Sequence, residues 1–169
     1  MEVDSREIRE RNEQVKQWLW RYREAKKDVR RYENELRELI ETQESTGAIE
    51  YSDMPKGSGS QSDLSDYMVK RDEAWKRIMK ARYKRIVVFQ EIKNAVEQLR
   101  NADEREVISC RYIQLNGYKE KSWEEICMIT GHEWRQTHYI HSRALGNIAN
   151  YLTILNRKEE DDTCGNMIC

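Results

Sequence analysis

An apolar repeat in the first part of the chain constrains the fold more than any other feature. Apolar and aromatic residues recur at heptad spacing in the series Ile8, Val15, Trp18, Tyr22, Ala25, Val29, Tyr32, Leu36 and Leu39. A period of 3.5 residues indicates a helix that packs lengthwise against another helix. Charged residues make up 36% of the sequence, which long solvated helices tolerate because only two positions in seven must be apolar. The repeat therefore predicts a helix over about residues 5–43 that needs a partner helix.

The partner is expected in residues 63–100. Residues 45–62 hold most of the turn-forming residues and the only proline, so they are predicted to form a flexible loop. Beyond it lies a wide apolar stripe that includes Trp75, which we expect in the core together with Trp18. A long antiparallel helical hairpin over residues 1–100, similar to a coiled coil, is the simplest arrangement. Its wide stripe leaves apolar surface for the C-terminal module or for a second copy of the chain.

The basic charge of the sequence is concentrated in the second predicted helix. Residues 64–100 carry ten basic and five acidic side chains. Six of the basic residues are clustered: Lys76, Arg77, Lys80, Arg82, Lys84 and Arg85. Such a cluster is either a solvated helix face or a patch that grips phosphates or an acidic partner. Both interpretations remain open at this point.

Several functional classes lack support in the sequence. The N-terminus has no apolar core of a signal peptide, and no apolar run approaches the ~20 residues of a membrane span. The four cysteines form no C-x-x-C pair, which favours free thiols in the cytoplasm and no metal site. We find no catalytic triad and no glycine loop that could cradle a phosphate. We therefore expect a cytoplasmic protein that binds no membrane or cofactor and is not an enzyme.

The segment 101–155 reads as short helices in quick succession. Asn101 with Glu104 is a plausible helix cap, and Ser122 with Glu125 forms an S-x-x-E capping box. Gly131 permits a tight turn before a final helix over about residues 133–152. The order of helix, glycine turn and longer helix predicts a helix-turn-helix. In this motif, Ile126 and Ile129 are expected to pack the first helix against the second. Ile140 and Leu145 are expected to anchor the second helix. The polar tail 156–169 is expected to be disordered, and the fold class is all-α.

Residues in this segment carry a resemblance to a known family. The residues are Asp103-Glu104-Arg105-Glu106-Val107-Ile108, Arg111-Tyr112, Ser122-Trp123-Glu124-Glu125-Ile126, Gly131, Ile140 and Arg143-Ala144-Leu145. Together they resemble region 4 of bacterial sigma factors. With its helical N-terminal half and the Ser52-Asp53-Met54-Pro55 loop, the chain is similar to small prophage-encoded regulators of the RinA/ArpU type. The resemblance implies a transcriptional regulator, such as an activator of phage or mobile-element genes, that binds double-stranded DNA and has RNA polymerase as a candidate partner.

The resemblance also implies which side chains face DNA. The candidates are Trp134, Arg135, Gln136, His138, Tyr139, His141 and Arg143. Arg135 suits guanine and Gln136 suits adenine, and each good bidentate contact contributes ~1–3 kcal/mol of discrimination. Because Arg135 is the only cation in the first turns of this helix, the reading surface is poor in charge. Such a reader is expected to depend on a homodimer formed through the hairpin, on the basic cluster or on RNA polymerase.

Two other interpretations stay open. The chain could be a coiled-coil phage assembly protein, such as a small DNA-packaging subunit, in which the C-terminal helices hold DNA with little sequence reading. Alternatively, those helices form a packing unit with no role on DNA. The mass in solution separates the assembly protein from the regulator, because a packaging ring contains many copies.

Overall fold

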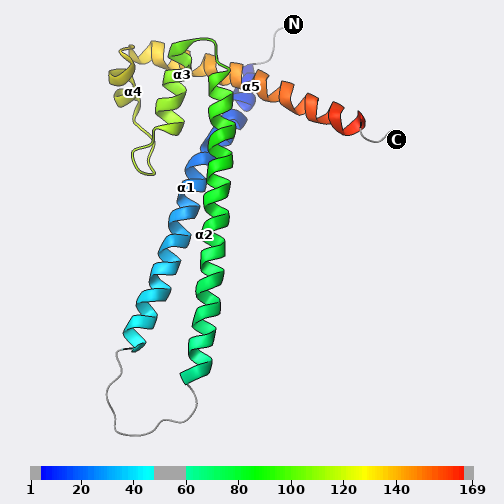
Figure 1. Ribbon diagram of the computed structural model, residues 1–169. Coiled ribbons are helices and arrows are strands. Elements are labelled where there is room, and N and C mark those ends of the chain that lie inside the picture. Colours follow the sequence, from blue (N-terminus) through cyan, green and yellow to red (C-terminus); the bar gives the residue numbers. More distant parts are fainter. Residues whose placement is uncertain (1–4, 48–59, 166–169) are drawn as a thin grey trace. The chain divides into compact units, whose positions relative to one another are not determined.

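The computed structural model describes residues 5–47 and 60–165, and this part of the chain consists of helices joined by short turns (Figure 1). Residues 1–4, 48–59 and 166–169 lie outside the described residues. The chain divides into two compact units, one of residues 1–24 and 87–169 and the other of residues 25–86. This division differs from the boundary expected near residue 100. The ends of both long helices belong to the same unit as the C-terminal helices, because they share its core.

The two long helices extend beyond their predicted bounds at the central loop. Helix α1 spans Ser5–Gly47 and helix α2 spans Ser60–Glu97. The predicted loop 45–62 is therefore helical at both edges, and its remainder lies outside the described residues. Helix α1 ends at the first glycine of the sequence, and α2 begins after Gly59, in keeping with the low helix propensity of glycine.

Among residues 25–44 and 65–86, whose side chains the structure describes in this unit, few are buried. They are Ala25, Val29, Leu36, Ile78 and Ala81. Two ion pairs link its helices: Arg82 Nη2 lies 2.7 Å from Glu33 Oε1, and Lys84 Nζ lies 3.9 Å from Asp28 Oδ2.

Trp75 corrects the sequence prediction within this unit, because it is 46% exposed and not part of a core. Met79, Tyr83 and Ile86 are also exposed, each by more than half. Few side chains of α1 and α2 are buried here, so the wide apolar stripe of α2 is only partly covered.

The main core lies in the other unit and joins the ends of α1 and α2 to the C-terminal helices. Its buried residues are Val15, Leu19, Val88, Ile92, Val96, Leu99, Ile108, Tyr112, Ala144, Leu145, Ile148 and Ala149. Trp18, expected in the core, packs against it while only partly buried, and its neighbour Leu19 is fully buried. A helix of 3.6 residues per turn drifts from the 3.5-residue repeat, which brings Leu19 inward when several helices surround α1.

Helix α3 (Ala102–Ile108) begins at the predicted cap. The Asn101 side chain accepts a hydrogen bond of 2.8 Å from the backbone N–H of Asp103. The backbone of Asn101 is extended, at φ −84° and ψ 131°, so α3 begins as a new helix after the end of α2 at Glu97. The sequence predicts that Glu104 also takes part in this cap. Its side chain is instead buried and accepts a hydrogen bond from Arg143 of α5. A π-helical segment, η1 (Ser109–Ile113), follows α3 directly.

The last two helices begin and turn much as the sequence predicts. Gly117, at φ +68°, lies in the turn closed by the bridge between Asn116 and Lys119. Helix α4 (Trp123–Thr130) follows, and helix α5 spans Trp134–Gly165. Residues 156–165, expected to be disordered, are therefore helical; they contain no proline, and their first glycine is Gly165. None of the described helices is long and apolar enough to cross a membrane.

Candidate nucleic-acid interface

The junction of α4 and α5 is built from local signals that the sequence displays. The Ser122 hydroxyl accepts a bond of 3.2 Å from the Glu125 N–H, and the Glu125 carboxylate accepts one of 2.6 Å from the Ser122 N–H. At the other end of α4, Gly131 adopts φ +69° and its N–H donates to the Cys127 carbonyl over 2.9 Å. The capping box and the left-handed glycine are both confirmed. They fix the direction in which the chain enters α5.

One face of α5 is held in the protein interior. Thr137, Ile140, Ala144, Leu145 and Ile148 are buried, and Ile126 of α4 is fully buried in a cluster with Ile140. Ile129, expected to share this packing, is 49% exposed. It lies three residues after Ile126, and α4 is too short to bury both sides of its apolar surface.

Four of the predicted reading residues are exposed: Arg135, Gln136 and Tyr139 lie on the opposite face of α5, and Trp134 is its first residue. Arg135 and Gln136 are exposed, and the exposed fractions of Trp134 and Tyr139 are 56% and 64%. No core position requires these residues, and they lie on the first two turns of the helix. This exposed row is the surface that α5 can offer to a binding partner.

His138 lies between two indole rings and is only partly accessible. Its ring centroid is 4.1 Å from that of Trp123 and 4.1 Å from that of Trp134. Its Nε2 atom is buried without a hydrogen-bond partner in the described part of the chain. Burial, with the nearby Arg111 guanidinium, lowers the pKa of His138 below its ordinary value. A neutral, stacked imidazole positions Trp134 and is poorly suited to a phosphate contact.

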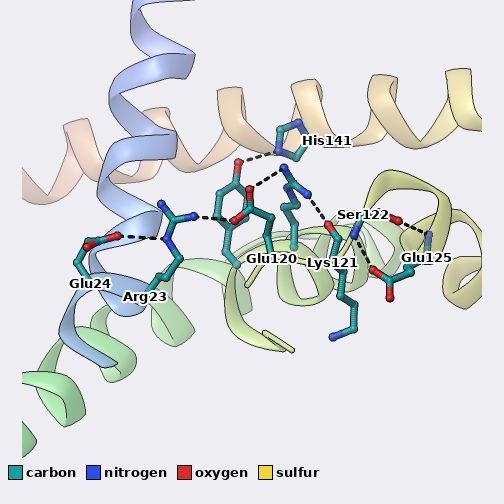
Figure 2. Close-up of polar contacts among 9 residues, drawn as sticks. Arg23, Glu24, Glu120, Lys121, Ser122, Glu125 and His141 are labelled. Atoms are coloured by element: carbon teal, nitrogen blue, oxygen red, sulfur yellow. Dashed lines mark hydrogen bonds and ion pairs between the residues drawn. The ribbon is translucent and has the colours of Figure 1, made fainter. Parts of the chain in front are cut away.

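His141 corrects the sequence prediction, which placed it on an exposed surface. It is 6% exposed, and its Nε2 lies 3.0 Å from the Tyr112 hydroxyl (His141 is labelled in Figure 2). Burial, and then the charges of Lys16 and Arg111, lower the pKa of His141 to about 3. His141 therefore belongs to the core and not to the exposed face of α5 that carries Arg135, Gln136 and Tyr139.

Arg143 is anchored by a buried carboxylate. Its Nε donates to Glu104 Oε1 over 2.5 Å, and Asn147 Nδ2 donates to Glu104 Oε2 over 2.9 Å. Glu104 is only 2% exposed, whereas the Arg143 side chain is 42% exposed. Its guanidinium also lies 5.7 Å from the ring centroid of Tyr139. Arg143 thus remains available at the surface while it holds α5 to α3.

A second polar network supports the segment before α4 and was not predicted. Figure 2 shows Arg23 of α1 reaching Glu120, at 2.6 Å between Nη1 and Oε2. Arg111 lies 3.7 Å from the same carboxylate, donates to the Lys121 carbonyl, and stacks on Trp123 with its guanidinium 4.7 Å from the ring centroid. Arg111 was among the residues of the family resemblance, but nothing in its spacing indicated these partners. Arg23 and Glu120 are 97 residues apart in sequence, and Arg111 and Lys121 are ten residues apart, on the two sides of a turn.

The basic cluster of α2 lies in the unit of residues 25–86. Lys76, Arg77, Lys80, Arg82 and Lys84 are exposed and Arg85 is partly buried. Arg82 and Lys84 pair with α1, and Arg77 lies 3.8 Å from Glu73. Part of the cluster therefore compensates acidic residues of its own unit.

Comparisons with protein-family models, with curated proteins and with solved structures found no match. Within the described part of the chain, no three His, Cys, Asp or Glu side chains are grouped so that they could hold a metal ion.

Proposed function

We propose that the chain is a sequence-specific DNA-binding transcriptional regulator in which α4 and α5 act as a helix-turn-helix. One observation carries the proposal: Trp134, Arg135, Gln136 and Tyr139 are exposed together on the first turns of a helix whose other face is buried. A recognition helix needs this combination, because its N-terminal residues enter the major groove while its back is fixed by the domain. The resemblance to sigma factor region 4 points the same way.

The exposed residues suggest how bases would be read. Arg135 suits the two acceptors of guanine and Gln136 suits adenine, each contributing ~1–3 kcal/mol of discrimination. The rings of Trp134 and Tyr139 offer apolar surface to thymine methyl groups. We propose that the target genes belong to a phage or mobile element and that the bound regulator contacts RNA polymerase, as the resemblance implies.

We further propose that α1 and α2 form an antiparallel hairpin through which the chain dimerises. The apolar side chains Trp75, Met79, Tyr83 and Ile86 are exposed at steps of three and four along α2. Residues 76–85 hold six basic and no acidic side chains, whereas residues 33–44 of α1 hold five acidic and one basic. The stripe of α2 therefore suits α1 of a second copy, whose acidic residues would face the basic cluster. Because the reading surface of one α5 is poor in charge, a dimer would strengthen DNA binding by adding the α5 of the second copy.

Selection of duplexes from a random DNA library tests the reading function. The parent chain is expected to enrich one sequence. Arg135→Ala and Gln136→Ala are each expected to lose preference at one base pair, and a gel-shift assay should show the free energy of discrimination at that position fall by ~1–3 kcal/mol. Arg100→Ala and Gln98→Ala serve as matched controls, because both residues are exposed just after the end of α2 and neither is on α5. Enrichment that is unchanged in the two α5 variants would show that α5 does not read bases.

A further inference from the structure

We propose that the groove between the start of α1 and the middle of α5 holds a backbone phosphate of the DNA that α5 reads. This inference rests on the proposed function and assigns a part of it to residues that no motif indicates. The groove has a volume of about 350 Å³ and is lined by two arginines, three asparagines, a serine, a tyrosine, Ile8 and Gly146. No carboxylate is among the residues that line it. Guanidinium, amide and hydroxyl groups are the common protein ligands of DNA phosphates.

Arg11 provides the uncompensated charge of the groove. Among the described residues it makes no hydrogen bond or ion pair, whereas Arg21 and Arg23 of the same helix pair with Glu91 and Glu120. Its Nη2 lies only 3.6 Å from the point that a Cβ atom on Gly146 would occupy. The guanidinium therefore rests directly on α5, and an anion bound there would touch both helices.

Arg143 forms another part of the groove wall and is held in place from behind. The Glu104 carboxylate accepts a hydrogen bond from the Nε–H of Arg143. Glu104 itself is buried and does not line the groove. This pair fixes the direction of the Arg143 side chain, and it also balances its charge. A phosphate would therefore gain most of its net electrostatic attraction from Arg11 and most of its positional definition from Arg143.

Asn12 adds a donor that is not engaged elsewhere. Its Oδ1 is buried without a hydrogen-bond partner, and its amide makes no other hydrogen bond with the described residues. The Nδ2 group of Asn12 is therefore not committed to another partner, and an amide N–H₂ can donate to an anion in the groove. Ser142 and Asn150, which also line the groove, are neutral donors of the same kind.

The position of the groove agrees with the position of the reading face. Tyr139 and Arg143 line the groove and also continue the exposed row that begins with Arg135 and Gln136. Gly146 follows Gln136 by about 15 Å along the helix, at 1.5 Å per residue. The major groove is ~12 Å wide, so a helix that reads bases at its N-terminus brings this point to the phosphates at the edge of the groove.

The test is the salt dependence of DNA affinity for Arg11→Gln, measured on the selected duplex and on a random one. Each phosphate contact contributes ~0.9 to the slope of log K against log salt. We expect Arg11→Gln to lower the slope by about that amount and to weaken binding of both duplexes by the same factor. Arg11→Lys should keep the slope, because it keeps the charge. Arg9→Gln is the matched control: Arg9 is exposed on the same helix, makes no ion pair within the described chain and does not line the groove.

An unchanged slope in Arg11→Gln, or an equal drop in Arg9→Gln, would overturn the inference. If Arg135→Ala still relaxes base selection in that case, the proposed function stands and only the phosphate site falls. If the parent chain binds neither duplex at low salt, both fall. Inorganic phosphate, compared with chloride at equal ionic strength, should not raise the melting temperature of the parent. A rise that Arg11→Gln abolishes, with an unchanged DNA slope, would assign the groove to free phosphate instead.

Discussion

At the scale of single residues, burial gives the histidines of this chain different roles. The His141 ring hydrogen-bonds to Tyr112 inside the core, and burial raises the pKa of that tyrosine hydroxyl while it lowers the pKa of His141 to about 3. His138 is stacked between two tryptophans, and His132 lies 3.7 Å from Asp103. The sequence presents all three near the predicted reading helix. Only the packing around them makes His141 a core residue and His138 a support for Trp134.

The buried His141 predicts a loss of stability in mild acid. The unfolded chain takes up a proton on this residue near pH 6.5, its ordinary pKa, whereas the folded protein does so only near pH 3. The contribution is therefore complete above pH 6.5 and is lost as the pH falls toward 3, by up to ~1.4 kcal/mol per pH unit. Urea unfolding of the parent and of His141→Gln at pH 7, 6 and 5 measures it. The variant is expected to show the shallower pH dependence, and equal slopes would contradict the assignment.

At the scale of elements, short-range signals fix the ends of the helices around the proposed reading surface. The capping box of Ser122 starts α4 and the left-handed Gly131 ends it. Both act through hydrogen bonds within a few residues of chain, so they form whatever the rest of the protein does. The π-helical segment η1 is different, because none of the patterns that mark the helix ends indicates it. Its residues Arg111 and Tyr112 reach partners on other elements.

Two glycines in this region predict opposite effects of the same substitution. Gly131→Ala is expected to destabilise the protein by ~1 kcal/mol or more, because alanine is strained at φ +69°. Gly146→Ala is expected to stabilise it by ~0.5–1 kcal/mol, because position 146 is inside α5 and an added Cβ would meet only Arg11 at an ordinary contact distance. Thermal or urea unfolding of both variants provides the check. A stabilising Gly131→Ala would mean that the turn after α4 is not left-handed.

At the scale of the whole molecule, the core is distributed unevenly. The unit of residues 1–24 and 87–169 contains both hydrophobic clusters, one of which includes side chains of both long helices. The unit of residues 25–86 buries mainly small or isolated apolar side chains and leaves Trp75, Met79, Tyr83 and Ile86 exposed. A row of large apolar side chains on a solvated helix usually marks an interface. This is the physical basis of the proposed dimer.

Sedimentation equilibrium tests the dimer directly. The parent is expected to have twice the mass of one chain, and Met79→Glu or Tyr83→Glu is expected to shift it to the monomer, because a carboxylate would be buried in the interface. Met128→Glu is the control, since Met128 is 78% exposed and lies on α4. A parent that sediments as a single chain at high concentration would refute the dimer, and a large ring would favour the DNA-packaging interpretation.

The sequence by itself determined the features that depend on neighbouring residues. These are the all-helical fold of the described chain, the capping box at Ser122, the turn at Gly131 and the exposure of Trp134, Arg135 and Gln136. Helix propensity, capping and local glycine geometry act within about one turn of helix, so they can be read directly from the order of the residues.

The tertiary structure decided which apolar and polar side chains are buried. It placed Leu19 inside and Trp75 outside, buried His141 and Glu104, and left Arg11 without an ion pair in a groove of the described chain. Each of these outcomes depends on a partner far away in sequence. Periodicity identifies the apolar face of a helix, but only the packing of other elements against that face sets how much of it is covered and which charges it brings together.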